Sequence, residues 1–105
     1  MVRVINGMRY NTKTAEEIEC WNNGYYSSDF NHCNETLFRT KNGNYFVYGE
    51  GGALSKWSES VGNNGRGGSS GIIAFTNQDV LEWFEERELD IPETCPEVMI
   101  LVKDA

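Results

Sequence analysis

The stretch that decides the fold is residues 36–57, TLFRTKNGNYFVYGEGGALSKW. Two runs of alternating apolar and polar residues flank Asn42-Gly43. An Asn-Gly pair in that position predicts a two-residue hairpin turn, because both turn residues must adopt positive φ. The glycines of residues 49–52, GEGG, predict a second turn directly after the hairpin. We expect this hairpin to form the centre of a sheet.

A two-residue loop also predicts the register of the hairpin. It pairs Thr40 with Tyr45 and Phe38 with Val47, and because side chains alternate along a strand, these four residues would share one face. The opposite face would carry Leu37, Arg39, Phe46 and Tyr48. Neither face is fully polar, so we expect helices to cover one face and loops or a partner to cover the other.

The N-terminal part predicts one more hairpin and a helix. Asn6-Gly7 lies between two short apolar runs, which predicts a hairpin with Arg3, Ile5, Met8 and Tyr10 on one face. Thr14, with Glu17 three residues later, has the spacing of a capping box. We therefore expect a short helix over residues 15–23.

The C-terminal part predicts a strand, a helix and an edge strand. Residues 72–75 form a short apolar run, and Thr76 or Asn77 would cap a helix over residues 78–88. The apolar run 98–102 predicts a final edge strand. The chain is thus expected to be a single α+β domain over residues 1–105, with a small antiparallel sheet of two Asn-Gly hairpins plus one strand, packed by two short helices.

The net charge of −7 is concentrated in the last quarter of the chain. Residues 1–78 contain equal numbers of acidic and basic residues, so residues 79–105 hold the whole excess. Such an acidic block repels nucleic acid and attracts basic surfaces. Direct nucleic-acid binding is therefore disfavoured, although a stacking surface could be built from Arg39, Lys41, Lys56 and Arg66 with Tyr45 and Tyr48.

Acidic residues line one face of the second expected helix. Asp79, Glu82 and Glu86 lie at helical spacing, and Glu85 extends the row. The row can be read as a solvated face that maintains solubility, or as a mimic of nucleic-acid phosphates that binds a basic groove. In the second interpretation the expected partner-binding residues are Asp79, Glu82, Glu85, Glu86, Asp90, Glu50, Asn63 and Asn64.

The sequence favours no catalytic or metal site. Cys20, His32 and Cys33 lack the spacing of zinc ligands, and an adjacent His-Cys pair is poorly placed for nucleophilic catalysis, although His32 could meet Cys20 or Cys95 across the fold. The glycine-rich residues 49–71 contain no phosphate-binding motif. We therefore expect a flexible surface loop there in preference to an anion site with Asn63, Asn64 and Arg66 as donors. No cofactor, catalytic residue or metal is expected.

The expected location is the cytosol. There is no long apolar run of the kind that spans a membrane or forms the core of a signal peptide. Three widely spaced cysteines also fit a reducing compartment better than a disulfide framework.

Several motifs together resemble a group of small proteins from phages, plasmids and conjugative elements of Gram-positive gut bacteria. The matching segments, with x for positions outside the pattern, are INGxxYxTxTA (residues 5–15), SDF (28–30), LFRTKxGxYFxYGEGGAxSK (37–56) and GNN (62–64). The resemblance covers about residues 3–90, whereas residues 91–105 depart from the more polar helical tail that is common in the group.

The resemblance implies an anti-CRISPR or anti-restriction inhibitor. We therefore expect a non-enzymatic protein that binds a CRISPR effector nuclease, with type II favoured, and blocks guide RNA or target DNA through its acidic surface. The alternative is a homodimeric scaffold or regulatory module of a mobile element, associating through Phe46 and Tyr48 without mimicry of nucleic acid.

Overall fold

The computed structural model describes residues 1–61 and 65–105 and confirms an α+β fold. Its elements are β1 (Val2–Ile5), β2 (Met8–Asn11), β3 (Glu16–Asn22), β4 (Cys33–Arg39), β5 (Tyr45–Gly51), β6 (Glu59–Val61), β7 (Gly65–Gly67), β8 (Ser69–Phe75), α1 (Asn77–Glu86) and α2 (Pro96–Met99).

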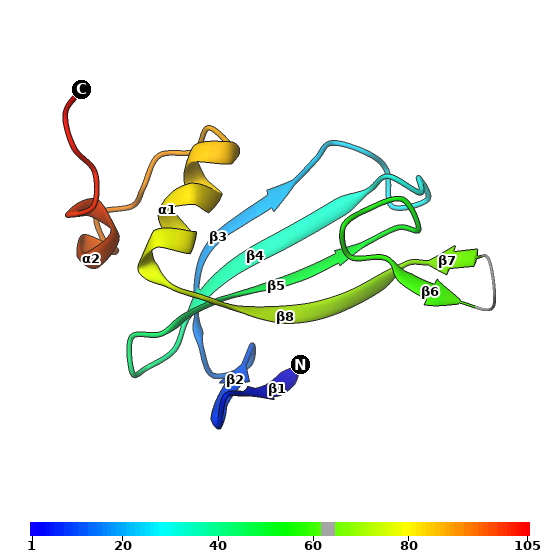
Figure 1. Cartoon of the computed structure of the whole chain (residues 1–105), viewed down its shortest axis with the longest axis horizontal. Helices are drawn as coiled ribbons and strands as arrows, with labels where there is room; N and C mark the ends of the chain where they lie inside the picture. Colours follow the sequence, from blue (N-terminus) through cyan, green and yellow to red (C-terminus); the bar gives the residue numbers. More distant parts are fainter. Residues whose placement is uncertain (62–64) are drawn as a thin grey trace.

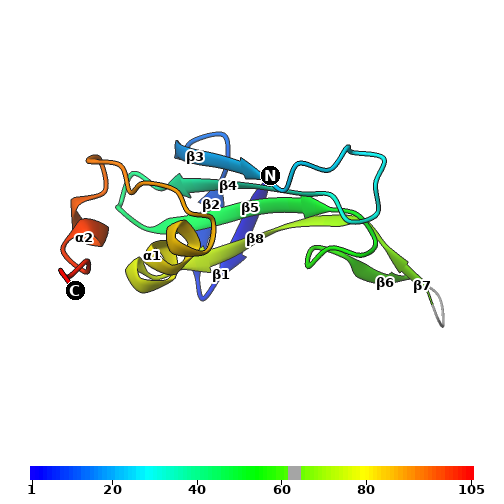
Figure 2. The same cartoon turned by 90° about the horizontal axis from the view of Figure 1, so that it is seen from above.

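One four-stranded antiparallel sheet organises the molecule, in the order β3-β4-β5-β8. The expected central hairpin, β4–β5, does lie in the middle of this sheet (Figure 1). The hairpins β1–β2 and β6–β7 form separate two-stranded sheets. Figures 1 and 2 show α1 on one face of the main sheet and the β1–β2 hairpin on the other.

The register expected for the central hairpin is wrong by one residue. The structure pairs Arg39 with Tyr45 and Phe38 with Phe46. Within the loop of this hairpin, residues 41–43, only Gly43 has positive φ (87°). The Thr40 hydroxyl accepts a hydrogen bond from the Asn44 amide at 3.1 Å. The loop therefore contains three residues rather than two, since a residue in the left-handed region closes a loop of that length.

This change of register also changes which residues share a face. Leu37, Tyr45 and Val47 face α1, whereas Phe38 and Phe46 face the N-terminal hairpin. Each face therefore has its own apolar cluster, and both are covered by the chain itself. The expected cover of helices on one face is confirmed.

The helix expected over residues 15–23 is wrong, because this segment is the edge strand β3. The pairing with β4 shifts between Glu17 and Glu19, which leaves Ile18 as the extra residue of a β-bulge. The bulge reverses the alternation of side chains, so Ile18 and Trp21, three residues apart, both pack against the same cluster. The bulged strand therefore places apolar residues three positions apart on one face, which is the spacing that a helix would also give.

The N-terminal hairpin follows the sequence prediction. Asn6 and Gly7 both have positive φ (51° and 78°), as a two-residue turn requires. The register pairs Ile5 with Met8, and Tyr10 is buried with its ring centroid 5.4 Å from that of Phe46. The hairpin thus covers one face of the main sheet.

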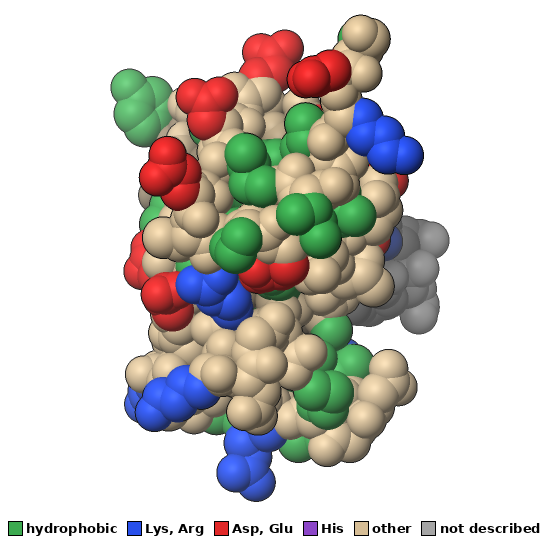
Figure 3. Space-filling model, turned by 90° about the vertical axis from the view of Figure 1, so that its left-hand side faces the viewer, with side chains coloured by type: hydrophobic (Ala, Val, Ile, Leu, Met, Phe, Trp, Pro, Cys, Tyr) green, Lys and Arg blue, Asp and Glu red, His purple; other side chains and the backbone are tan. Residues whose placement is uncertain are grey.

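The expected C-terminal helix is confirmed as α1, with Thr76 as its N-cap in a capping box with Asp79. The edge strand expected over residues 98–102 is wrong, because this run lies in and after the short helix α2. Only Val98 is fully buried, and Ile100 is 77% exposed. Figure 3 shows hydrophobic side chains grouped on this end of the molecule.

The glycine turn expected at residues 49–52 is also wrong in its position. Strand β5 continues through Gly49 to Gly51, and the chain turns only afterwards. A side chain at Gly49 would overlap the indole ring of Trp57, which packs across the strand. This glycine therefore permits a close approach that brings residues 52–58 over the face of the sheet that α1 covers.

Candidate functional site

A buried carboxylate lies at the centre of the α1 side of the sheet. Glu35 is in β4, two residues from Cys33 and Leu37, and its side chain points to the same face as theirs. The residue is only 2% exposed. A buried charge needs compensating partners, because water no longer solvates it.

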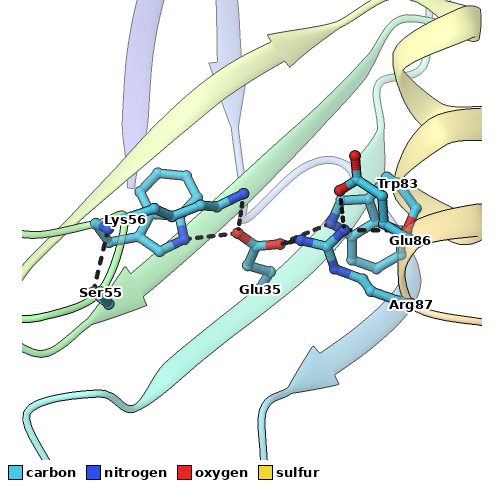
Figure 4. A network of polar contacts seen from close by, with 7 residues as sticks. Glu35, Ser55, Lys56, Trp83, Glu86 and Arg87 are labelled. Carbon is cyan, nitrogen blue, oxygen red and sulfur yellow. Dashed lines mark hydrogen bonds and ion pairs between the residues drawn. The ribbon is translucent and has the colours of Figure 1, made fainter.

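Four donors from two segments surround this carboxylate (Figure 4). The indole Nε1 atoms of Trp57 and Trp83 each donate a hydrogen bond of 2.8 Å to one of its oxygens. The Lys56 ammonium lies 2.7 Å from Oε2, and the Arg87 guanidinium donates to Oε1. The carboxylate thus ties the loop before β6 to the end of α1.

The Arg87 side chain is held inward by aromatic rings. Its guanidinium carbon lies 4.6 Å from the centroid of Trp21 and 4.7 Å from that of Trp83. The side chain is 8% exposed, and Nη1 donates to the backbone carbonyl of Trp83 at 3.1 Å. Lys56, by contrast, is 55% exposed and lies over the ring of Trp57. All three tryptophans of the chain therefore contribute to this network.

The electrostatics favour an ionised carboxylate beside a protonated thiol. Burial alone would raise the pKa of Glu35, but hydrogen bonds from Lys56 and Trp83 outweigh that effect and lower the pKa below its usual range. Burial, together with the negative charge of Glu35, raises the pKa of the Cys33 thiol. Glu35 thus acts as a fixed anion that anchors cations, and Cys33 lacks the thiolate character of a nucleophile.

The outer face of α1 carries the acidic row that the sequence predicts. Glu82, Glu85 and Glu86 are exposed, while Asp79 is partly buried and accepts a hydrogen bond from the Thr76 amide at 2.9 Å. Glu86 lies 3.5 Å from Arg87 but remains 74% exposed. Among the described residues, the side chains of Glu82 and Glu85 form no ion pair.

A shallow pocket of about 140 Å³ lies between this row and the Glu35 network. Asp79, Glu82 and Glu86 contribute three carboxylates to its wall, and Phe75 of β8 contributes an apolar surface. The two cations in the wall, Lys56 and Arg87, already bind Glu35. The pocket therefore offers net negative charge next to the edge of the sheet.

Other residues of the expected partner-binding set do not join this surface. Glu50 is exposed on the opposite face of the sheet, where Asn34 donates a hydrogen bond to it at 3.1 Å. Asp90 is exposed beyond the end of α1. Asn63 and Asn64 lie outside the described residues.

The cysteines do not assemble a metal site in the described part of the chain. Cys20 is exposed, Cys33 and Cys95 are buried, and all three are free. His32 Nδ1 lies 2.7 Å from the backbone carbonyl of Asp29. Within residues 1–61 and 65–105, no group of three or more potential ligands is placed to hold a metal ion.

The basic and aromatic residues that could have formed a stacking surface are also separated. Arg39 lies 2.6 Å from Glu16 and 3.5 Å from Glu97, and its guanidinium lies over the ring of Tyr45. Tyr48 packs with the cluster on the opposite face. The positive charge of Arg39 is therefore already paired.

Sequence reasoning missed the Glu35 network. The available signal was one acidic residue in an alternating strand, at a position whose neighbours two residues away are apolar. Its partners could not be located, because Trp57 and Arg87 come from segments 22 and 52 residues away along the chain.

No helix within the described ranges is both long and apolar enough to cross a membrane. Comparisons with protein-family models, curated proteins and solved structures find no match for this chain.

Proposed function

We propose that this protein is a non-enzymatic inhibitor that binds a basic groove of another protein through the outer face of α1. The proposed target is a CRISPR effector nuclease, with type II favoured, in the cytoplasm of a bacterial host. The bound helix would block access of guide RNA or target DNA. This target is what the resemblance to proteins of mobile elements implies.

The observation that carries the proposal is the inward orientation of Arg87. The helix itself contains acidic residues and no basic residue, and the arginine that follows it points inward to buried Glu35 and contacts only Glu86 of the outer row, which stays 74% exposed. Glu82, Glu85 and Glu86 consequently present their charge to solvent. A groove that binds nucleic acid carries Lys and Arg side chains that pair with phosphates, and carboxylates at helical spacing can take the same places.

The residues that could support catalysis have structural partners, which favours a binding role. Glu35 has donors at both oxygens, and its pKa is lowered, so it does not exchange protons near neutral pH. The raised pKa of buried Cys33 opposes a nucleophilic role in the same way.

The test is charge reversal with a matched control. The variant Glu82→Lys/Glu85→Lys/Glu86→Lys should lose inhibition of DNA cleavage by a type II effector, and the control Glu17→Lys/Glu50→Lys/Glu59→Lys should retain it. Both variants change the net charge equally, but the control residues are exposed elsewhere on the fold. Association of the unaltered protein should slow as salt rises, because exposed charges are screened. Equal inhibition by both variants would exclude the acidic face as the binding surface.

A homodimeric scaffold remains the alternative function, but it would need a different surface. Phe46 is fully buried beneath the N-terminal hairpin, and Tyr48 is partly buried beside it. Light scattering on the purified protein distinguishes the two functions, because the inhibitor is expected to be a monomer before it meets its target.

A further inference from the structure

Strand β8 is an unprotected edge of the main sheet. Within residues 1–61 and 65–105 it pairs only with β5, over residues 69–75, so its other side carries backbone groups without a neighbouring strand among them. Its sequence, SSGIIAF, contains no charge, no proline and no bulge. Apart from the pairing with β5, no backbone hydrogen bond in the described part of the chain joins this strand to another segment.

The opposite edge of the same sheet is protected. Strand β3 carries Glu16, Glu17 and Glu19 and contains the β-bulge at Ile18. Charged residues and bulges are the usual means by which proteins prevent unwanted strand pairing. The contrast between the two edges indicates that β8 is available for pairing.

We propose that β8 binds an extended, positively charged segment of a partner protein, which adds a fifth strand to the sheet. The positive charge follows from the acidic pocket, because Asp79, Glu82 and Glu86 line it next to Phe75, at the end of β8. Ile73, two residues earlier on the same face, is 46% exposed. A lysine or arginine opposite Phe75 would reach the carboxylates, and an apolar side chain opposite Ile73 would cover it.

In strand addition, the affinity for the added segment and the selectivity for its sequence have different sources. Main-chain hydrogen bonds along β8 hold the added segment, and alternate side chains enter the adjacent pocket. A seven-residue segment of about 23 Å matches the length of β8. Figure 2 shows α1 near one end of β8 and the β6–β7 hairpin near the other. A second copy pairing through its own β8 would place the uncharged sequence SSGIIAF on this edge and bring no cation to the acidic pocket, so a separate basic segment fits this edge better.

This inference rests on the proposed function in one respect: the same basic partner would bring its positive charge to Glu82 and Glu86, which belong both to the acidic row and to the pocket. The pairing edge itself can fail or succeed independently of inhibition, because Ile73 is not part of the acidic row. The charge-reversal test addresses the helix, and the following test addresses the strand.

The probe is a synthetic peptide, Lys-Thr-Val-Thr-Val-Thr-Lys, whose symmetric pattern places a lysine opposite Phe75 and a valine opposite Ile73 in either strand direction. Fluorescence anisotropy should show binding of this peptide. A version with glutamate in place of both lysines, and a version with N-methylated backbone amides, should bind at least about tenfold more weakly. Amide exchange should slow in residues 69–75 and stay unchanged in residues 16–22.

Two variants of one exposed residue complete the test. Ile73→Lys places a charge on the edge beside the pocket and should weaken peptide binding about tenfold or more, whereas Ile73→Thr keeps the branched shape and should stay within about twofold. Equal binding of the lysine and glutamate peptides, or protection of β3 instead of β8, would overturn the proposal. A dimer in light scattering that dissociates in Ile73→Lys would also overturn it, because a second copy would then occupy the edge.

Discussion

Replacing Glu35 by glutamine should destabilise the protein strongly. The substitution preserves shape but removes the negative charge that compensates Arg87, whose side chain is only 8% exposed. Breaking a buried ion pair by removing one partner costs about 3–5 kcal/mol. Lys56 adds little to this figure, because its side chain is 55% exposed and water can solvate its ammonium once the carboxylate is replaced.

The expected loss is a large part of the total stability, which is about 5–15 kcal/mol for a domain. Urea unfolding followed by tryptophan fluorescence measures it directly, because all three tryptophans surround the carboxylate. Lys56→Gln is the matched control and should cost less than Glu35→Gln, because Arg87 and the two indoles still compensate the carboxylate. The double variant Glu35→Gln/Arg87→Met should recover part of the loss, because it removes both buried charges. A cost below about 1 kcal/mol for Glu35→Gln would refute this account of the network.

The remaining predictions concern pH, the cap, the glycine contact and the tyrosine. Because the pKa of Glu35 is lowered in the folded protein, its ionised side chain contributes fully to stability above the unfolded-state pKa of about 4.3. This contribution is lost as pH falls through the folded-state pKa. Urea midpoints measured from pH 7 to pH 2 should therefore decline less in Glu35→Gln than in the unaltered protein. Thr76→Ala should cost about 1 kcal/mol, because the capping box is lost, whereas Thr14→Ala should be nearly neutral, since Thr14 caps no helix; similar costs for both would contradict the assignment. Gly49→Ala should destabilise by about 1–3 kcal/mol in thermal unfolding, because the added methyl group overlaps Trp57; an unchanged melting temperature would show that the indole can move aside. Tyr45→Phe should cost about 0.5–1.5 kcal/mol in urea unfolding, because Glu97 loses its hydrogen-bond donor, and no change in the urea midpoint would count against that bond.

Local turn and capping signals predicted the N-terminal hairpin, the central position of the β4–β5 hairpin, and α1. Asn6-Gly7 has the backbone that its sequence requires, and Thr76 caps α1 in the way its spacing to Asp79 suggests. These signals succeed because neighbouring residues satisfy them. The central hairpin shows the limit, since the Asn-Gly pair at 42–43 fits both a two-residue and a three-residue loop, and the difference decides which face every side chain occupies.

Features that depend on distant segments could not be predicted. The spacing of Ile18 and Trp21 fits a helix as well as a bulged strand, and only the pairing with β4 distinguishes the two. The acidic row of α1 could be placed from its helical spacing, but the inward position of Arg87 depends on Glu35 and Trp21 in other strands. The sequence therefore indicates that the carboxylates lie on one face of α1, but it does not indicate that Arg87 turns away from most of that face.

The separation of the apolar residues into two clusters has a consequence for local motion. Tyr10, Phe38, Phe46 and Ile72 form one cluster under the N-terminal hairpin, and the tryptophans and α1 pack in the other, with the sheet between them. The first eleven residues can therefore detach transiently while the helix side stays folded, as a separate cooperative unit. Their amide protons should exchange through such local openings, at a lower free energy than those of the central strands.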